Sequence, residues 1–301
     1  MRRNNSVLEG RATTFARRAY AVKTRAALTI LVLLLGAAPS EATDLKPPTL
    51  AAWDSYVQVV NLNTTARATG SSPFLLADES PDMLQRVRNG ELVVTNHDPR
   101  KVPQGIIHHW IGVMFIPNVT LDRVMSVVEN YDHYSDYYKP LVQKSAVLER
   151  DGDHQKVSVV TVQKAFSVTA AVETDDEVQT VRLGADRLYI VTNAVRVQEI
   201  ADYGQPTEHP FPEDRRPGYV WRTVGVTRLE QRDGGVYVEM ETIALSRGIP
   251  AGLRWLIKPL TDNLPRKIML ETLGDTRAAV NGAAAPAPSN DQNIAESGTH
   301  H

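Results

Sequence analysis

The sequence predicts an α+β fold, in which a run of antiparallel strands precedes one long C-terminal helix. From about Gly105, apolar and polar residues alternate in short segments that are separated by turn residues. In the segment 248–281 the period changes, and apolar residues recur at steps of three and four: Leu253, Leu256, Ile257, Leu260, Leu264 and Ile268. An amphipathic helix that follows a set of strands buries its apolar stripe against their sheet.

The composition of the 301 residues is that of an ordinary globular protein, with 42% hydrophobic and 23% charged residues. The formal net charge of −2 gives no reason to expect nucleic-acid binding. Cysteine is absent, which excludes disulfides, thiol catalysis and thiolate metal sites. The chain also contains no Gly-rich phosphate loop, dinucleotide fingerprint or nucleophile elbow, so we expect no cofactor.

Residues 1–42 are predicted to be an export signal peptide. Basic residues precede the apolar run 26–38, and small residues follow it up to Ala42. The run is shorter than the roughly 20 residues that span a bilayer, so we expect cleavage and an exported protein, periplasmic or secreted. The alternative is an uncleaved signal that tethers the protein to a membrane. At the other end, residues 282–301 are small and polar and are predicted to be disordered.

Residues 43–104 are predicted to form a helical extension. Apolar residues at helical spacing indicate a helix over 49–61, and Ser80 followed by a proline indicates the start of a second helix that ends at Arg88. The apolar content of this part is too low for an independent core. We therefore expect it to pack on the main domain, which spans residues 105–281.

In the main domain, the first strand is followed by two short helices and then by a meander of strands. The helices are expected at 121–129 and 130–138. The strands are expected at 106–116, 141–149, 155–164, 167–174, 187–200, 219–231 and 236–246. The proline-rich segment 201–217 is expected to be a long surface loop.

This order of elements resembles the START-like, helix-grip (SRPBCC) superfamily, which includes polyketide cyclases and plant allergen-type ligand carriers. The resemblance covers about 105–280 and is carried by five segments: Trp110 to Val113, Leu121 to Val124, Glu129 to Tyr134, Gly234 to Glu239 and Leu245 to Pro250. It implies a curved antiparallel sheet of about seven strands wrapped around the C-terminal helix, with a deep apolar pocket between them. Members hold lipids, sterols, polyketides or other hydrophobic molecules, but share no universal catalytic motif.

The last hairpin indicates which side chains face the pocket. A turn at Asp233-Gly234 pairs Arg228 with Glu239, and a turn at Gly234-Gly235 shifts the partners but keeps the faces. Either way Arg228, Glu239 and Glu241 share one face, which we expect to be the solvated, convex one. The opposite face mixes aromatic, small and soft side chains, as a pocket wall does, although an ordinary sheet-on-helix core is the alternative.

The candidate ligand-binding residues come from that opposite face, from the C-terminal helix and from the first strand. They are Trp221, Thr223, Thr227, Met240, Thr242, Leu260, Leu264, Ile268 and His109. Pro259 and Pro265 predict a break in the helix, with a short helix over 250–257 and the main one from about Thr261. We expect the pocket entrance at this break.

Other polar groups have structural explanations. Glu239 and Glu241 form a carboxylate pair, but Arg228 on the same face neutralises them. His108 and His109 are adjacent on a strand and point to opposite faces, so we expect no metal site. Four tyrosines between Tyr131 and Tyr138 are placed to gate a ligand or to contact a membrane surface transiently, and packing with their hydroxyls in water is the alternative.

Three functions remain open from the sequence. The leading hypothesis is an exported, non-enzymatic binder or carrier of a hydrophobic small molecule or lipid. The rival is a cyclase or dehydratase-type enzyme, which needs polar residues inside the pocket. The third is an interaction module whose pocket has closed, with 44–104 as its contact surface.

Overall fold

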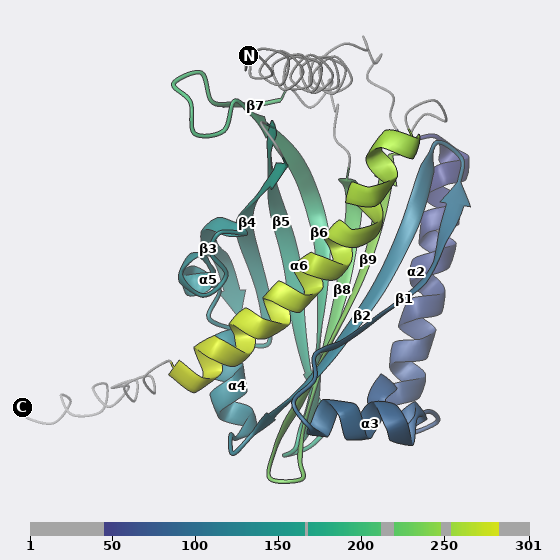
Figure 1. The fold of residues 1–301 in the computed structure, drawn as a ribbon, viewed down its shortest axis with the longest axis vertical. Coiled ribbons are helices and arrows are strands. Elements are labelled where there is room, and N and C mark those ends of the chain that lie inside the picture. Colours follow the sequence, from purple (N-terminus) through teal and green to yellow (C-terminus); the bar gives the residue numbers. More distant parts are fainter. Residues whose placement is uncertain (1–44, 166–167, 212–219, 248–253, 283–301) are drawn as a thin grey trace, which may run out of the picture.

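The chain folds around one large antiparallel sheet (Figure 1). The computed structural model describes residues 45–165, 168–211, 220–247 and 254–282, with the backbone alone for 164, 165, 168 and 254–263. The nine-stranded sheet has the order β1-β2-β9-β8-β6-β5-β4-β3, and β7 pairs with β6 outside this path. The strands are β1 Val93–Val102, β2 Gly105–Pro117, β3 Val142–Asp151, β4 His154–Ala165, β5 Val168–Arg182, β6 Arg187–Ala201, β7 His209–Pro210, β8 Val220–Arg232 and β9 Gly235–Arg247.

The helices lie on both faces of this sheet. They are α2 Pro47–Ala68, η1 Leu76–Glu79, α3 Pro81–Arg88, α4 Leu121–Val128, η2 Tyr131–His133, α5 Tyr134–Tyr137 and α6 Arg254–Gly282. We call the face that carries Gly112, Met114 and Leu229 the α6 face, because α6 crosses it (Figure 1). The opposite face, which carries Ile107, Val226 and Ile243, is the α2 face, because Trp53 of α2 packs there.

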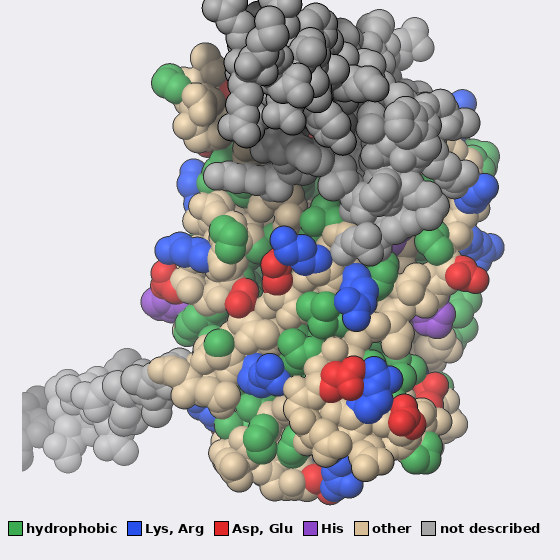
Figure 2. Space-filling model, viewed as in Figure 1, with side chains coloured by type: hydrophobic (Ala, Val, Ile, Leu, Met, Phe, Trp, Pro, Cys, Tyr) green, Lys and Arg blue, Asp and Glu red, His purple; other side chains and the backbone are tan. Residues whose placement is uncertain are grey.

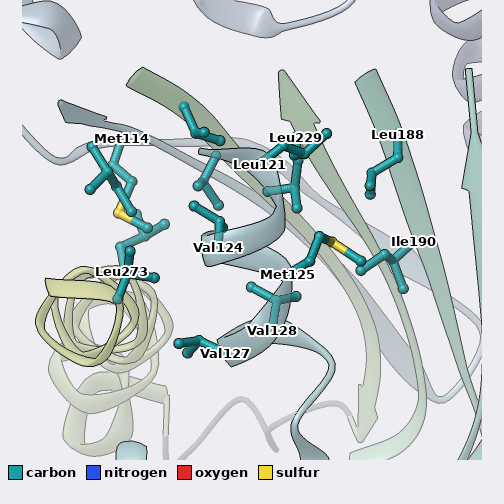
Figure 3. Close-up of a cluster of buried hydrophobic side chains, with 14 of the residues drawn as sticks. Met114, Leu121, Val124, Met125, Val127, Val128, Leu188, Ile190, Leu229 and Leu273 are labelled. Atoms are coloured by element: carbon teal, nitrogen blue, oxygen red, sulfur yellow. The ribbon is translucent and has the colours of Figure 1, made fainter. Parts of the chain in front are cut away.

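The main core lies between the α6 face, α4 and α6. Figure 3 shows Leu273 of α6 beside Met114 of β2, and Met125 of α4 directed toward Ile190 of β6. Helix α4 begins at Thr120, whose hydroxyl accepts a hydrogen bond from the Arg123 amide at 3.3 Å. The two short helices after the first strand are therefore confirmed, and they close one end of this core.

The hairpin of β8 and β9 has the first of the two expected registers. Arg228 pairs with Glu239, and Val226 pairs with Glu241. The turn residues Asp233 and Gly234 both have positive φ, at 57° and 78°, which is the conformation of a type I′ turn. The prediction that Arg228, Glu239 and Glu241 share one face of the sheet is confirmed.

The extension contributes more than helices. Its helix α2 runs seven residues beyond the expected end at 61, and the second helix ends at Arg88 as expected. Its last part forms β1, which pairs with β2 and adds an edge strand to the sheet. A register shift between His97 and Arg100 accommodates Pro99, which donates no backbone hydrogen bond.

Strand β5 is much longer than the segment 167–174 that the sequence indicated. The acidic run 175–177 was expected to lie beyond the strand, because such residues disfavour strands. In the structure β4 and β6 pair with this run on both sides. Arg196 of β6 also binds the Asp175 carboxylate, with 2.7 Å between Nε and Oδ2. Cross-strand partners outweigh the local preference here.

The predicted break in the C-terminal helix is wrong, because α6 is continuous from Arg254 to Gly282. Each proline removes one backbone donor and costs a helix interior about 3 kcal/mol. Burial of Met269, Leu273 and Val280 against the sheet and α4 offsets this cost. A pocket entrance at that break is therefore not supported, and residues 248–253 lie outside the described residues.

Candidate ligand-binding site

The α6 face changes character along β8 and β9. At the hairpin end Leu229 and Val238 are fully buried in the core. Further along the same face Thr227, Met240 and Thr223 are half-buried, and Thr242 is exposed. These are central strands of the sheet, so the loss of burial does not come from a sheet edge. We call the positions 223, 225, 227, 240, 242 and 244 the β8–β9 wall.

Helix α6 approaches the sheet at β2 rather than at this wall. Gly112 marks the closest approach, since a Cβ there would lie 2.7 Å from Met269 Cγ and 2.8 Å from Leu273 Cδ1. The helix also packs against β1, α4 and α5. Glycine at 112 therefore permits α6 to rest on β2, with the β8–β9 wall to one side of this contact.

The predicted residues of α6 do not make the main contact with the sheet. Leu264 and Ile268 are half-buried and lie outside the core cluster, whereas Met269, Leu273 and Val280 belong to it. The side chain of Leu260 lies outside the described residues. The ligand-binding role of these three positions and of the four wall residues Thr223, Thr227, Met240 and Thr242 stays a prediction.

The placement of Trp221 on the pocket face was wrong. A register shift between Val220 and Arg222 in the pairing of β8 with β9 breaks the alternation of faces. The indole of Trp221 therefore packs with the α2-face cluster, beside Gly105 and Leu245. A bulge of this kind leaves no periodic signal in the sequence.

His109 also lies on the α2 face, away from α6. Its Nε2 is 2.7 Å from Glu241 Oε1, and its Nδ1 is 2.9 Å from the Tyr56 hydroxyl of α2. It is a buried, hydrogen-bonded core histidine. It cannot line a pocket under α6, so it is removed from the candidate site.

The charged residues expected on a solvated face are buried. Arg228 is 1% exposed and Glu239 is fully buried. Arg228 Nη1 donates to Glu239 at 3.0 Å and to Glu241 at 2.7 Å, while its Nη2 donates to the Thr64 hydroxyl of α2 at 2.9 Å. The prediction that these residues share one face was correct, but the extension covers that face and solvent does not reach it. We call Arg228, Glu239, Glu241, His109 and Tyr56 the buried ion cluster.

Within the buried ion cluster, the pKa values of Glu239 and Glu241 shift in opposite directions. Burial raises the pKa of Glu241, but the hydrogen bond from His109 and the charge of Arg228 outweigh it and bring the pKa to about 2. Burial raises the pKa of Glu239, against the opposing effects of Arg228 and of the Leu76 amide, which donates to its Oε2 at 2.5 Å. Glu241 is thus the better compensated anion. The cluster fastens α2 and η1 to the sheet, so its role is structural.

Sequence reasoning missed the polar groups inside the α6 face. Asp176 of β5 is 8% exposed and pairs with Val157 of the main core. Its Oδ2 accepts a hydrogen bond from the Thr174 hydroxyl at 2.7 Å, and burial raises the pKa of its carboxyl. The sequence signal was the acidic run itself, since alternation in a strand must turn one of two adjacent aspartates inward.

Two further polar groups lie near Asp176 on the same face. Gln155 of β4 pairs with Val178, is 6% exposed, and its Oε1 has no hydrogen-bond partner among the described residues. Thr180 donates to Glu129 Oε1 at 2.7 Å at the end of α4. The interior opposite α4 is therefore rich in acceptor oxygens.

The four tyrosines pack inward around α5. Tyr131 and Tyr138 are buried, and the Tyr138 hydroxyl lies 3.0 Å from Thr276 Oγ1 of α6. The Tyr134 hydroxyl donates to the Val128 carbonyl at 2.5 Å. Their hydroxyls are engaged within the protein rather than in water. Contact with a membrane surface stays a prediction, and these side chains give it no support.

The described residues hold no group of three or more potential metal ligands. Within the same residues, no helix is long and apolar enough to cross a membrane. Figure 2 shows Lys and Arg side chains interspersed with Asp and Glu on the face viewed, without a large field of one sign in the coloured part. The geometry therefore directs attention to the β8–β9 wall and to the acceptor oxygens of β4 and β5.

Together, the antiparallel sheet, the two short helices after β2 and the C-terminal helix on one face define a helix-grip α+β protein. No family model and no curated protein matches the chain. Similar solved structures include a STAR-related lipid transfer protein from Xanthomonas axonopodis, with 15% identity and a TM-score of 0.40 over 63% of this chain and 98% of that one.

Two other similar structures come from bacteria. An aromatase/cyclase from Streptomyces has 11% identity and a TM-score of 0.41, over 58% of this chain and 94% of that one. A Thermus thermophilus protein has 17% identity and a TM-score of 0.40, over 58% and 98%. Since these TM-scores are below 0.5, the fold assignment rests on the sheet order and the position of α6, and function is argued from the residues.

Proposed function

We propose that this chain binds a hydrophobic small molecule, such as a lipid, between the β8–β9 wall and α6, and acts as its carrier. One observation carries the proposal: Thr223, Thr227 and Met240 are half-buried and Thr242 is exposed, on the core face of central strands. A filled sheet-on-helix core would bury these positions as it buries Leu229 and Val238. The gradient of burial supports a site beside the α6 contact.

The chemistry of the wall suits an apolar ligand. Met240 has a flexible and polarisable side chain that adapts to irregular surfaces. Gly225 adds no side chain to the wall, and a Cβ there would make only ordinary contacts, the nearest at 3.6 Å. Threonine methyl groups add apolar surface, and their hydroxyls can bond within the strand. Sites of this kind hold ligands mainly through apolar contact, with a few polar groups that fix orientation.

The test is binding of the neutral fluorescent hydrophobe Nile red to the purified chain and to Thr242→Trp. Position 242 is exposed, so the indole fills space in the site without entering the core. We expect affinity to fall roughly tenfold, equivalent to about 1.4 kcal/mol. Val195→Trp, at an exposed position of β6, is the matched control and should bind as the wild type does. No binding to the wild type, or equal binding to both variants, contradicts the proposal.

A second candidate function is a cyclase or dehydratase-type enzyme acting in the same site. It is favoured by Asp176, a buried carboxyl on the α6 face whose pKa is raised, as a general acid requires. Native mass spectrometry of ligand copurified with wild type and with Asp176→Asn distinguishes the two. A dehydratase predicts ligands that differ by one water between the two proteins, and a carrier predicts the same ligand in both.

We also propose that residues 1–42 direct export of this carrier. The support is the order of basic residues, apolar run 26–38 and small residues, which is typical of a signal peptide. N-terminal sequencing of the protein purified from its own cells should begin at Thr43. A mature protein that begins at Met1 contradicts cleavage, and fractionation with the soluble intracellular proteins contradicts export.

A further inference from the structure

The interior of the α6 face holds two buried acceptors, Asp176 and Gln155, whose hydrogen bonding within the protein is incomplete. Asp176 and Gln155 lie on neighbouring strands, because Gln155 pairs with Val178, two residues beyond Asp176. They are thus diagonal neighbours on one face, within reach of a single polar group between their side chains. Both are more than nine-tenths buried.

The protein itself compensates these two groups only in part. Among the described residues, Asp176 receives a hydrogen bond from Thr174, and the other charge acting on it is that of Asp175, which repels. No donor reaches Gln155 Oε1. A buried carboxylate without a cation and a buried carbonyl without a donor each destabilise the fold. Unsatisfied buried polar groups are rare in native proteins, and a bound molecule is one partner that can complete them.

Their position relates them to the proposed site. The row of the sheet that contains Gln155 continues through Val178, Thr192 and Gly225 to Thr242. Asp176 pairs with Ala194 in the next row, about two strand spacings, or roughly 10 Å, from Thr223 of the wall. A ligand that rests on the wall can therefore extend along this face toward Asp176 and Gln155.

We propose that the ligand is an amphiphile whose hydrogen-bond-donating end group, a hydroxyl or amine, binds Asp176 and Gln155 while its apolar body lies on the β8–β9 wall. This inference rests on the proposed function and adds the chemistry of the ligand's polar end. A carboxylate or phosphate end is disfavoured, because an anion there would face Asp176 and Glu129, and no cation among the described residues is recorded as acting on Asp176. A donor end group would bond to Gln155 Oε1, which has no partner among the described residues, and to the Asp176 carboxyl.

The test compares two probes of equal chain length that differ in the donor. Displacement of Nile red from the full chain is measured with 1-dodecanol and with its methyl ether, which lacks the hydroxyl proton. We expect the wild type to prefer the alcohol at least tenfold. In Gln155→Leu and in Asp176→Val the preference should fall to threefold or less. Gln179→Leu makes the same chemical change at an exposed position of β5 and should keep the full preference.

The two proposals fail in distinguishable ways. If the wild type binds neither Nile red nor the two probes, the proposed function is wrong. The proposed binding of a polar end group by Asp176 and Gln155 is then wrong as well. If both probes bind the wild type equally, or if both variants keep the preference for the alcohol, the hydrophobic site is supported. The proposed binding of the polar end group by Asp176 and Gln155 is then overturned. Gln155→Leu should also raise the Tm, since it replaces an unsatisfied buried group, so the test does not depend on Asp176→Val folding.

Discussion

The close packing of α6 against β2 depends on Gly112. A methyl group there would lie 2.7 Å from Met269 Cγ and 2.8 Å from Leu273 Cδ1. We expect Gly112→Ala to destabilise the chain by about 1–3 kcal/mol, because overpacking forces side chains and the helix to shift. Gly225→Ala is the matched control, since its Cβ would meet ordinary contacts at 3.6 Å or more. Urea unfolding checks this, and equal stability of the two variants contradicts it.

Glu241 should make the stability of the chain dependent on pH in the acid range. Its pKa is about 2 in the fold and 4.5 in an exposed side chain. A carboxyl with a lowered folded pKa stabilises the fold above the unfolded value, and this contribution is lost as the pH falls through the folded value. Glu241→Gln should cost about 3 kcal/mol at pH 7, because it weakens a buried pair with Arg228.

The difference between wild type and Glu241→Gln should then shrink as the pH falls from 4.5 to 2. Glu239 acts in the opposite direction, since its pKa is raised, but it is present in both proteins and largely cancels in the difference. Unfolding by urea at several pH values measures this difference. A gap that stays constant down to pH 2 would show that the Glu241 carboxylate is not the stabilised form.

Element by element, α2 protects the α2 face from water. Trp53 is buried against Ile107 and Ile243, while Leu62 on the outer side of the same helix is 63% exposed. Trp53→Ala should therefore destabilise the protein by about 3–5 kcal/mol and expose the buried ion cluster. Leu62→Ala should change stability by less than about 0.5 kcal/mol. Thermal unfolding checks both, and a small effect at Trp53 would mean that α2 is not part of the core.

The order of strands and helices could be read from the sequence because it depends on local periodicity and turn chemistry. The hairpin of β8 and β9 predicted which residues share a face, and the structure has the first of its two possible registers. Burial could not be read in this way, because it depends on what covers each face. Arg228 and Glu239 were grouped correctly and then assigned to solvent, since nothing local shows that α2 covers them.

Only part of the candidate site could be predicted from the sequence. Thr223 and Met240 lie on the expected face because alternation holds in that part of the strands. The predicted position of Trp221 was wrong because a bulge breaks the alternation of faces. The predicted position of His109 was wrong because its partner Tyr56 comes from the extension. Asp176 was missed because β5 continues through an acidic run that its neighbouring strands stabilise.

For the whole molecule, the central claim is that a hydrophobic ligand lies between the β8–β9 wall and α6. Photoaffinity labelling of the purified chain with a diazirine-bearing long-chain alcohol, followed by peptide mapping, tests it most directly. We expect adducts in peptides of β8, β9 and α6, and competition by unlabelled 1-dodecanol. Adducts confined to α2, or labelling that the unlabelled alcohol does not reduce, would contradict it.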